Sequence, residues 1–239
     1  MKLPRPLHPW RVSPTRAVEI QHALARRVHE TRPRRAFRLV AGLDTARFQP
    51  ESDHCVAGVV VWDLATRRVL EERVCILAVR FPYVPGLLSF REAPALLAVL
   101  RRLRQVPDVL LCDGHGRAHP RRFGLACHLG LLTGLPSVGC AKGLLVGEHP
   151  NLGWRRGSRA GLRDRGVQSD EIIGSVVRTR DGVRPVYVSV GHRIDLASAE
   201  ALVLDCCEGF RIPEPTRRAD HLVSMAASGG KLAILGVGT

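Results

Sequence analysis

Hydrophobic positions follow a helical period in the first segment of the chain. Ser13 suits the N-cap of a helix and Pro14 suits its first turn. Apolar residues then recur at spacings of three and four: Ala17, Ile20, Ala23, Leu24 and Val28. The pattern predicts an amphipathic helix over residues 13–30, followed by a basic break around Pro33.

After this break the period changes, and three runs rich in valine, isoleucine and leucine follow. Short polar turns separate the runs, which are Phe37–Leu43, Cys55–Trp62 and Val69–Ile76. Because such connections are too short for a crossover, we expect three antiparallel strands. An irregular loop over residues 80–89 comes next, and the pattern of residues 90–104 predicts a helix.

Strands alternate with helices in the remainder of the chain. The predicted elements are strands at 109–112 and 137–141, helices at 120–132 and 196–207, and a hairpin that joins 171–178 to 185–190. We interpret residues 157–166 as a basic loop. This order indicates one α/β domain over residues 1–224, with a mixed sheet and helices on both faces. Residues 225–239 have no clear partner and are expected to form a loose tail.

The composition excludes several classes of protein. Of the 239 residues, 45% are hydrophobic, which permits a sizeable core. No uncharged apolar run reaches the roughly 18 residues of a membrane span, and the N-terminus lacks the apolar run of a signal peptide. We therefore expect a cytoplasmic protein. The seven cysteines are odd in number and show no C-x-x-C spacing, which predicts reduced core residues and gives no support to zinc.

The charge of the chain is strongly positive. The formal net charge is +14, and arginine supplies most of it because the lysines are only Lys2, Lys142 and Lys231. A bias in genome composition explains the arginine excess equally well. A net charge of this size nevertheless favours a polyanionic partner such as nucleic acid.

Two aspartates stand where apolar strands are expected to end. Asp44 follows the apolar run in VAGLDTA, and Asp113 follows the next buried strand in LLCDGHG. Taken alone, each is more typical of a strand-to-loop turn. On adjacent parallel strands, however, two carboxylates would lie close together and would repel each other unless a cation neutralised them. Oxygen ligands of this kind suit Mg²⁺ or Mn²⁺.

Two further acids are weaker candidates on pattern alone. Glu92, in SFREAP, begins a predicted helix, where a carboxylate also complements the helix dipole without any function. Asp220, in PTRRAD, lies near the end of the chain and is typical of a solvated surface residue.

Six blocks of sequence, in this order and spacing, resemble the endonuclease V family. They lie between Pro33 and Ser224 and read VAGLDTA, FPYVPGLLSFRE, LLCDGHGRAHPRRFGLACHLG, VGCAKGLL, VSVGHRIDLASA and RIPEPTRRAD. One block alone would be weak evidence, whereas the combination is specific. The resemblance implies a ribonuclease H-like fold, which matches the predicted order of elements, and a Mg²⁺-dependent endonuclease in which Mn²⁺ can substitute.

The resemblance also implies roles for individual residues. The metal-binding acids would be Asp44, Glu92, Asp113 and Asp220. Lys142, in CAKG, would reach the scissile phosphate and act in catalysis with the first three acids. Asp220 falls where the family carries either aspartate or histidine, and His221 follows it directly. The assignment at this end of the chain therefore stays open by one residue.

In the family, the block PYVP acts as a wedge that separates strands, and here it is Pro82, Tyr83, Val84 and Pro85. A proline-stiffened loop holds an aromatic side chain ready to replace a base in the stack. An ordinary loop with Tyr83 packed inward explains the pattern equally well. The remaining residues expected at the extruded base or at phosphate are Gly86, Leu88, Gly114, Gly116, His119 and His192.

The implied reaction is hydrolysis of a phosphodiester beside hypoxanthine, read as deoxyinosine in DNA, as a step of DNA repair. Two divalent ions would hold the attacking water and the leaving oxygen in line. The cut would fall at the second phosphodiester 3′ to the lesion and leave 3′-hydroxyl and 5′-phosphate ends. Three alternatives stay open: the same chemistry on inosine-containing RNA, a different ribonuclease H-like nuclease without a wedge, and a non-catalytic basic nucleic-acid-binding module.

Overall fold

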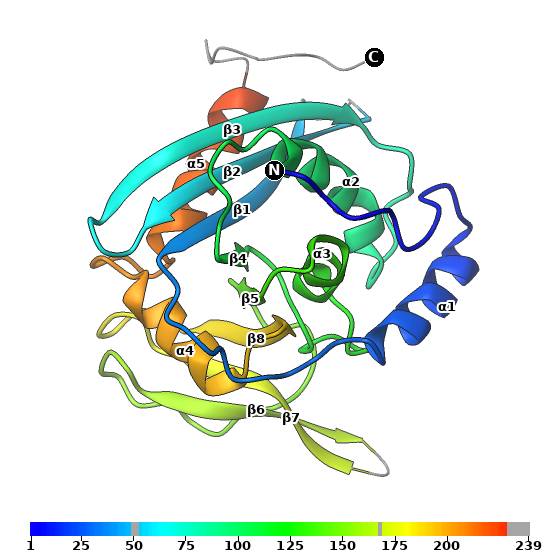
Figure 1. Cartoon of the computed structure of the whole chain (residues 1–239). Coiled ribbons are helices and arrows are strands. Elements are labelled where there is room, and N and C mark those ends of the chain that lie inside the picture. Colours follow the sequence, from blue (N-terminus) through cyan, green and yellow to red (C-terminus); the bar gives the residue numbers. More distant parts are fainter. Residues whose placement is uncertain (49–52, 167–168, 229–239) are drawn as a thin grey trace.

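A single mixed sheet organises the computed structural model, which describes residues 1–48, 53–166 and 169–228. Its eight strands lie in the order β3-β2-β1-β4-β5-β8-β7-β6 (Figure 1). They are β1 (Leu39–Phe48), β2 (His54–Asp63), β3 (Arg68–Ala78), β4 (Val109–Cys112), β5 (Ser137–Ala141), β6 (Arg159–Gly166), β7 (Ser169–Val177) and β8 (Val186–His192). β1, β4 and β5 run parallel, and the other neighbours are antiparallel. The predicted mixed sheet is confirmed.

Helices cover both faces of this sheet (Figure 1). The five helices are α1 (Pro14–Ala25), α2 (Leu88–Arg101), α3 (Leu125–Thr133), α4 (Leu196–Asp205) and α5 (Glu214–Ala227). Successive strand residues point to opposite faces. Leu43 and Cys112 therefore pack with α2 and α3, whereas Val40 and Leu111 pack on the face that carries α4. Within the described residues, no helix is both long and apolar enough to cross a membrane.

β1 is longer than the apolar pattern predicts, so Asp44 lies inside this strand and not at its end. The parallel pairing with β4 stops at Leu43 and Cys112, while the antiparallel pairing with β2 continues to Phe48. Beyond Leu43 the strand is thus covered on one edge only. The apolar run therefore stops where the second neighbour stops, although the strand itself goes on.

Two helices begin or end differently from the prediction because loop contacts replace helical hydrogen bonds. α1 ends at Ala25, and the backbone of His29 bonds instead to His192 Nδ1 and to the amide of Arg193. α3 begins at Leu125 and not at residue 120. Arg122 has a φ of 54°, which an α-helix does not accommodate, and its guanidinium binds Asp164 and Glu171.

Two elements lie where the sequence analysis placed none. Residues 159–166, interpreted as a basic loop, form the edge strand β6, whose polar side chains suit an exposed edge. The missed helix α5 buries one stripe: Ala219, Leu222, Val223 and Ala226. Because α5 continues to Ala227, residues 225–227 of the predicted tail are helical. Residues 229–239 lie outside the described part of the chain.

Candidate active site

Three parallel strands deliver polar side chains to one edge of the sheet. Asp44 follows Leu43 in β1, Asp113 follows β4, and Lys142 follows β5. The amide of Asp113 donates to the carbonyl of Leu43 at 3.0 Å, which fixes the two aspartates side by side. By the alternation along each strand, all three side chains point to the face that α4 and α5 cover.

Helix α5 brings a fourth polar side chain to this edge because two glycines allow it to lie close to the sheet. A Cβ atom on Gly42 would lie 2.1 Å from the carbonyl carbon of Pro215, at the start of α5. A Cβ atom on Gly58 would lie 2.6 Å from Val223 Cγ1, near its end. Asp220 lies between these contacts, and its Oδ2 is 3.4 Å from Lys142 Nζ.

Glu92 reaches the same edge from the opposite face. It lies in the second turn of α2, a helix whose apolar side packs on β1, β2 and β4. Thr45 follows Asp44 and points toward α2 by the same alternation, and its hydroxyl donates a hydrogen bond to the Glu92 carboxylate. The backbone amide of Thr45 donates to Asp44 Oδ1 at 2.7 Å. Thr45 thus links the two acids across the sheet.

The carboxyl groups of this site are held where their ionised forms are disfavoured. Burial, and next the charge of Asp113, raise the pKa of Asp44 to about 8. Burial raises the pKa of Glu92 to about 7, against the hydrogen bond from Thr45. Burial also raises the pKa of Asp113, although the hydrogen bond from Lys142 opposes it. Added positive charge at this edge would therefore favour the ionised acids.

Lys142 supplies one positive charge within the cluster. Its Nζ lies 2.5 Å from Asp113 Oδ2, and the side chain is 40% exposed. Burial lowers the pKa of Lys142, but the hydrogen bond and the charge of Asp113 outweigh it and leave the pKa raised. The ammonium therefore stays protonated and open to solvent, as a phosphate-binding group requires.

Loop 80–87, which joins β3 to α2, is anchored at one residue and open at another. Phe81 is 3% exposed and packs with Phe90 and Phe123, whereas Tyr83 is 69% exposed. Directly after Tyr83, the amide of Leu87 donates a hydrogen bond to the carbonyl of Val84 at 2.9 Å and closes the turn over residues 84–87. The alternative in which Tyr83 packs inward is therefore wrong. The loop is a firm support that presents an aromatic ring to solvent.

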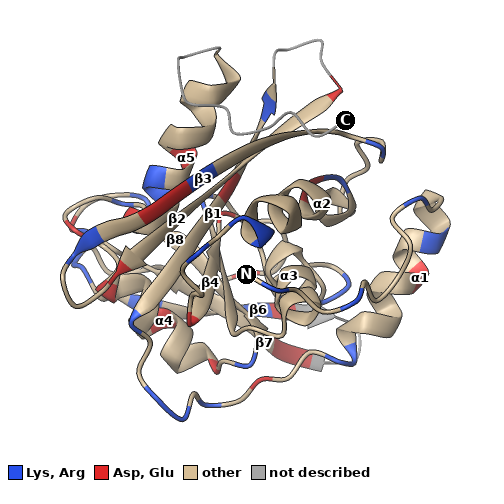
Figure 2. Cartoon of the chain, turned by 45° about the horizontal axis from the view of Figure 1, so that its top comes forward, with Lys and Arg blue, Asp and Glu red and all other residues tan. Residues whose placement is uncertain are grey.

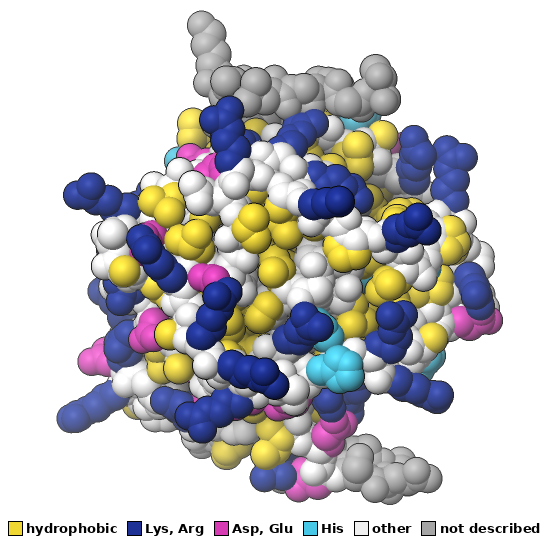
Figure 3. All heavy atoms as spheres, viewed as in Figure 1, with side chains coloured by type: hydrophobic (Ala, Val, Ile, Leu, Met, Phe, Trp, Pro, Cys, Tyr) yellow, Lys and Arg dark blue, Asp and Glu magenta, His cyan; other side chains and the backbone are white. Residues whose placement is uncertain are grey.

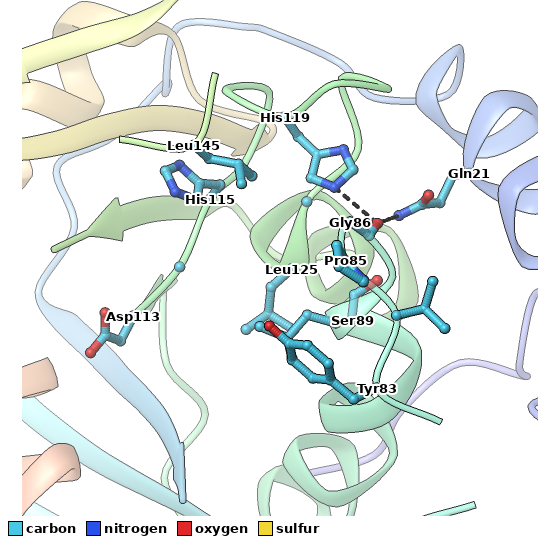
Figure 4. Close-up of a pocket in the computed structure, with 14 residues that line it drawn as sticks. Gln21, Tyr83, Pro85, Gly86, Ser89, Asp113, His115, His119, Leu125 and Leu145 are labelled. Carbon is cyan, nitrogen blue, oxygen red and sulfur yellow. Dashed lines mark hydrogen bonds between the residues drawn. The ribbon is translucent and has the colours of Figure 1, made fainter. Parts of the chain in front are cut away.

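A pocket of about 220 Å³ lies between loop 80–87 and loop 113–124 (Figure 4). The residues expected near the base or as the wedge that line it are Tyr83, Val84, Pro85, Gly86, Leu88, Gly114 and His119. Asp113 also lines the pocket, so the acid cluster and the pocket share a wall. A ligand inside the pocket would therefore lie next to Asp113, which is one of the acids of the cluster.

The carbonyl of Gly86 holds the two loops together. It accepts hydrogen bonds from Gln21 Nε2 at 3.0 Å and from His119 Nε2 at 3.0 Å (Figure 4). It also accepts one from Arg121 Nη2 at 2.7 Å. His119 Nδ1 accepts from the amide of Arg121, so its Nε2 carries the hydrogen. Burial lowers the pKa of His119 to about 4, and the ring is neutral. Both ring nitrogens of His119 therefore take part in holding the two loops together.

Three expected site residues lie outside the pocket lining. Pro82 is exposed before the turn. Gly116 is buried against β8, where its amide donates to Ser189 Oγ at 2.8 Å. His192 pairs with Ser137 at the start of β5, whereas Lys142 follows the end of that strand. His192 accepts a hydrogen bond from the His29 amide and serves the packing of the segment after α1.

Six residues that line the pocket were not predicted from the sequence: Gln21, Ser89, His115, Gly124, Leu125 and Leu145. A signal existed for Gln21, because it occupies the buried stripe of α1 with Ala17, Ile20 and Leu24 and is the polar member of that stripe. His115 gave no signal in sequence. Its Nδ1 is one of two buried polar side-chain atoms without a partner among the described residues.

Basic side chains are spread over the surface of the molecule (Figure 2 and Figure 3). Figure 2 shows arginine and lysine spread over loops and strand ends, with acids on β1 and β3. In Figure 3 basic side chains outnumber acidic ones across one whole face. Clustered acids beside a lysine, a pocket and a positive surface together suit hydrolysis of a polyanion.

The comparisons with known proteins agree with one another. Residues 22–221 match the family model described as Endonuclease V. The endonuclease V of Roseiflexus castenholzii is 49% identical over 217 residues, which cover 91% of this chain and 95% of that protein.

Solved structures give the same result. The crystal structure of the endonuclease V from Streptomyces avermitilis superposes with a TM-score of 0.84 at 45% identity, and covers 92% of this chain and 95% of that chain. An endonuclease V structure from Ciona intestinalis has a TM-score of 0.78 at 22% identity, with 90% and 98% covered, which shows likeness of fold.

Proposed function

The chain belongs to the endonuclease V family, and on that premise we propose that it hydrolyses DNA beside a deoxyinosine with the help of Mg²⁺. One observation carries the proposal: Asp113 belongs to the acid cluster and also lines the pocket. A base lodged in the pocket would place its own backbone at the acids. The Ciona intestinalis structure was solved in complex with DNA containing an inosine, which supports this substrate.

The donor set of the cluster fits Mg²⁺ in its chemistry, because all its candidate ligands are carboxylate oxygens. Burial is the main cause of the raised pKa values of Asp44, Glu92 and Asp113, so a cation bound beside them would favour their ionised forms. In the described residues, no three acidic, histidine or cysteine side chains already converge on one point. The carboxylates of Asp44, Glu92, Asp113 and Asp220 would hold the ion. We expect Mn²⁺ to substitute.

Different residues of the site would hold the metal ion and bind the scissile phosphate. A bound divalent ion would stabilise the charge that develops on the attacking and leaving oxygens. Lys142, freed from Asp113, would bind a non-bridging oxygen of the scissile phosphate. Asp44 lies on an inner strand between Glu92 and Asp113. It would therefore be the acid that contacts bound metal from both sides of the site.

The place of the cut follows from the resemblance of motifs and is part of the proposal. Cleavage at the second phosphodiester 3′ to the lesion would leave 3′-hydroxyl and 5′-phosphate ends. Tyr83 would fill the gap that the extruded base leaves in the stack, since its ring is exposed on an anchored turn. Extrusion would then bring the base into the pocket and the next phosphates to the acids.

The test uses four labelled duplexes of one sequence, in which the DNA or RNA strand carries either one inosine or the normal base. Each is incubated with Mg²⁺ or with chelator. We expect nicking of the inosine DNA in Mg²⁺ only, at the second bond 3′ to inosine. Faster nicking of the inosine RNA would make RNA the substrate. Equal cutting with and without inosine would make the protein a nuclease of different specificity.

A further inference from the structure

Four polar groups in line connect the pocket to the N-terminal segment. His8 Nδ1 lies 2.9 Å from the carbonyl oxygen of Pro9, and His8 Nε2 lies 2.7 Å from His128 Nε2. His128 Nδ1 lies 3.0 Å from Ser89 Oγ. Of these residues Ser89 lines the pocket, while the two histidines stand behind it. The polarity of each hydrogen bond in the line depends on the one before it.

Both rings in the line are neutral near pH 7. Burial lowers the pKa of His8 below its ordinary value, against the hydrogen bond to Pro9. Burial also places the pKa of His128 well below the ordinary value. The rings pack against Trp10, Phe90 and Phe123 at steep angles, an apolar setting that disfavours imidazolium. Each ring therefore carries one N–H and one lone pair.

The direction of the hydrogen bonds follows from the carbonyl at one end. A carbonyl oxygen only accepts, so His8 Nδ1 carries the hydrogen and His8 Nε2 offers a lone pair. His128 Nε2 must then donate to His8, which leaves His128 Nδ1 as an acceptor. The hydroxyl of Ser89 must donate to His128 Nδ1 and has no second hydrogen to offer. The Ser89 oxygen is left with lone pairs alone.

We infer that Ser89 is a specificity-determining residue, an acceptor of fixed polarity that receives the N1–H of hypoxanthine in the pocket. The inference rests on the proposed function and names the atom that this function reads. Adenine carries a lone pair at N1, and its deamination to hypoxanthine places a hydrogen there. An acceptor that cannot become a donor attracts the deaminated base and repels the parent base.

Most other polar groups of the pocket are engaged elsewhere. Asp113 is bound to Lys142, and both ring nitrogens of His119 are hydrogen-bonded to loop backbone. The Gly86 carbonyl is already engaged by three donors, and the Gln21 amide is bound to Gly86 and Phe123. His115 Nδ1 bonds to no described protein group that would select a tautomer of its ring. An imidazole without such a partner adapts to either base. Discrimination at N1 therefore falls to Ser89.

The experiment compares nicking of duplexes that contain one inosine or one nebularine, a purine with a lone pair at N1 and no 6-oxygen. The quantity is the ratio of kcat/KM for inosine to that for nebularine. We expect Ser89→Ala to lower this ratio about tenfold, with the loss on the inosine substrate. His8→Phe retains Ser89 and an aromatic ring at position 8, but it removes the acceptor that fixes the tautomer of His128. It should lower the ratio in the same direction, although no atom of His8 lines the pocket.

A matched control is available because His149 repeats the local geometry of His8. Its Nδ1 lies 2.9 Å from the carbonyl oxygen of Pro150, but its ring meets Tyr187 edge-on and does not contact His128. His149→Phe should leave the ratio unchanged. Equal losses on both substrates in Ser89→Ala and His8→Phe would show that the line serves packing only and would overturn the inference. Absence of inosine cutting by the wild-type protein would overturn the proposed function, and the inference with it.

Discussion

Lys142 Nζ lies 2.5 Å from Asp113 Oδ2 and 3.4 Å from Asp220 Oδ2, so one ammonium joins two acids that lie far apart in the sequence. Neither strand register nor helix packing alone places these acids together. Burial raises the pKa of Asp113, the hydrogen bond from Lys142 opposes this effect, and Asp113 in turn raises the pKa of Lys142. Lys142 thus holds the two acids in place, and its positive charge also competes with any cation that these acids bind.

Lys142→Met separates these two roles. If Lys142 binds the scissile phosphate, kcat should fall about a hundredfold or more, in the range typical of lost catalytic groups. The Mg²⁺ concentration for half-maximal nicking should not rise, because a competing charge has been removed. The measurement is a Mg²⁺ titration of nicking, with Lys2→Met as the control. A higher Mg²⁺ requirement would instead show that Lys142 mainly organises the acids.

Asp44→Asn should stabilise the metal-free protein at alkaline pH. The pKa of Asp44 is raised from 3.8 to about 8, so the folded state binds this proton more tightly than the unfolded state. Between these values the folded protein loses stability as the pH rises, and above pH 8 the loss is complete. The neutral asparagine removes this loss. We expect the Tm of the variant in chelator to exceed the wild-type value at pH 8.5 by about 2 °C or more, and by less at pH 5.

Asp63, an aspartate whose pKa is shifted in the opposite direction, serves as the control. The hydrogen bond from Arg38 lowers the pKa of Asp63, so Asp63 contributes stability above its unfolded pKa and loses it as the pH falls. Asp63→Asn should therefore destabilise the protein at pH 8.5. Addition of Mg²⁺ should raise the Tm of the wild type more than that of Asp44→Asn, because the ion binds the ionised acid. A Tm of Asp44→Asn below wild type at pH 8.5 would contradict the raised pKa.

The fold was predictable wherever one physical cause set the sequence pattern. Antiparallel neighbours with short turns, such as β1 to β3, and the hairpin of β7 and β8 were predicted and are confirmed. The pattern failed at β6, because an edge strand buries little and its arginines mimic a loop. It also failed at α5, although Ala219, Leu222, Val223 and Ala226 follow the helical spacing that should have revealed it.

The site was predictable by residue type more than by geometry. Asp44 and Asp113 were expected to meet on adjacent strands, and the structure places them side by side. Their strand context was only half right, since Asp44 lies within β1. Hydrogen bonds between distant segments were invisible in sequence, because no local pattern encodes them. The three donors on Gly86 and the line from His8 to Ser89 are of this kind.

Asp220 and His221 are separated by their side-chain positions on α5. Asp220 points to Lys142 at 3.4 Å, whereas His221 is exposed on the next position of the helix. Asp220→Asn should therefore raise the Mg²⁺ concentration for half-maximal nicking severalfold. His221→Asn should leave it within error of the wild type in the same titration. The reverse result would assign the metal contact to His221 and shift the register of the last motif by one residue.

The exposed ring of Tyr83 gives a prediction about substrate form. Extrusion of a base from a duplex costs a few kcal/mol, and a ring that stacks in the gap returns about 1–3 kcal/mol. Tyr83→Ala should therefore lower kcat/KM on an inosine duplex by about ten- to a hundredfold. On the same strand without its complement the loss should be smaller, because the neighbouring bases are already loosely stacked. Nicking rates on both substrates measure the difference.

Tyr83→Phe is the conservative control, because it keeps the aromatic face and removes only the hydroxyl. Since Tyr83 is 69% exposed and Phe81 anchors the loop, neither variant should change the Tm noticeably. Residual cutting by Tyr83→Ala should still depend on Mg²⁺, because the ring lies apart from Asp44, Glu92 and Asp113 in the chain. Full activity of Tyr83→Ala on the duplex would remove the wedge from the mechanism. Equal losses on single and double strands would make Tyr83 a wall of the pocket, which it also lines.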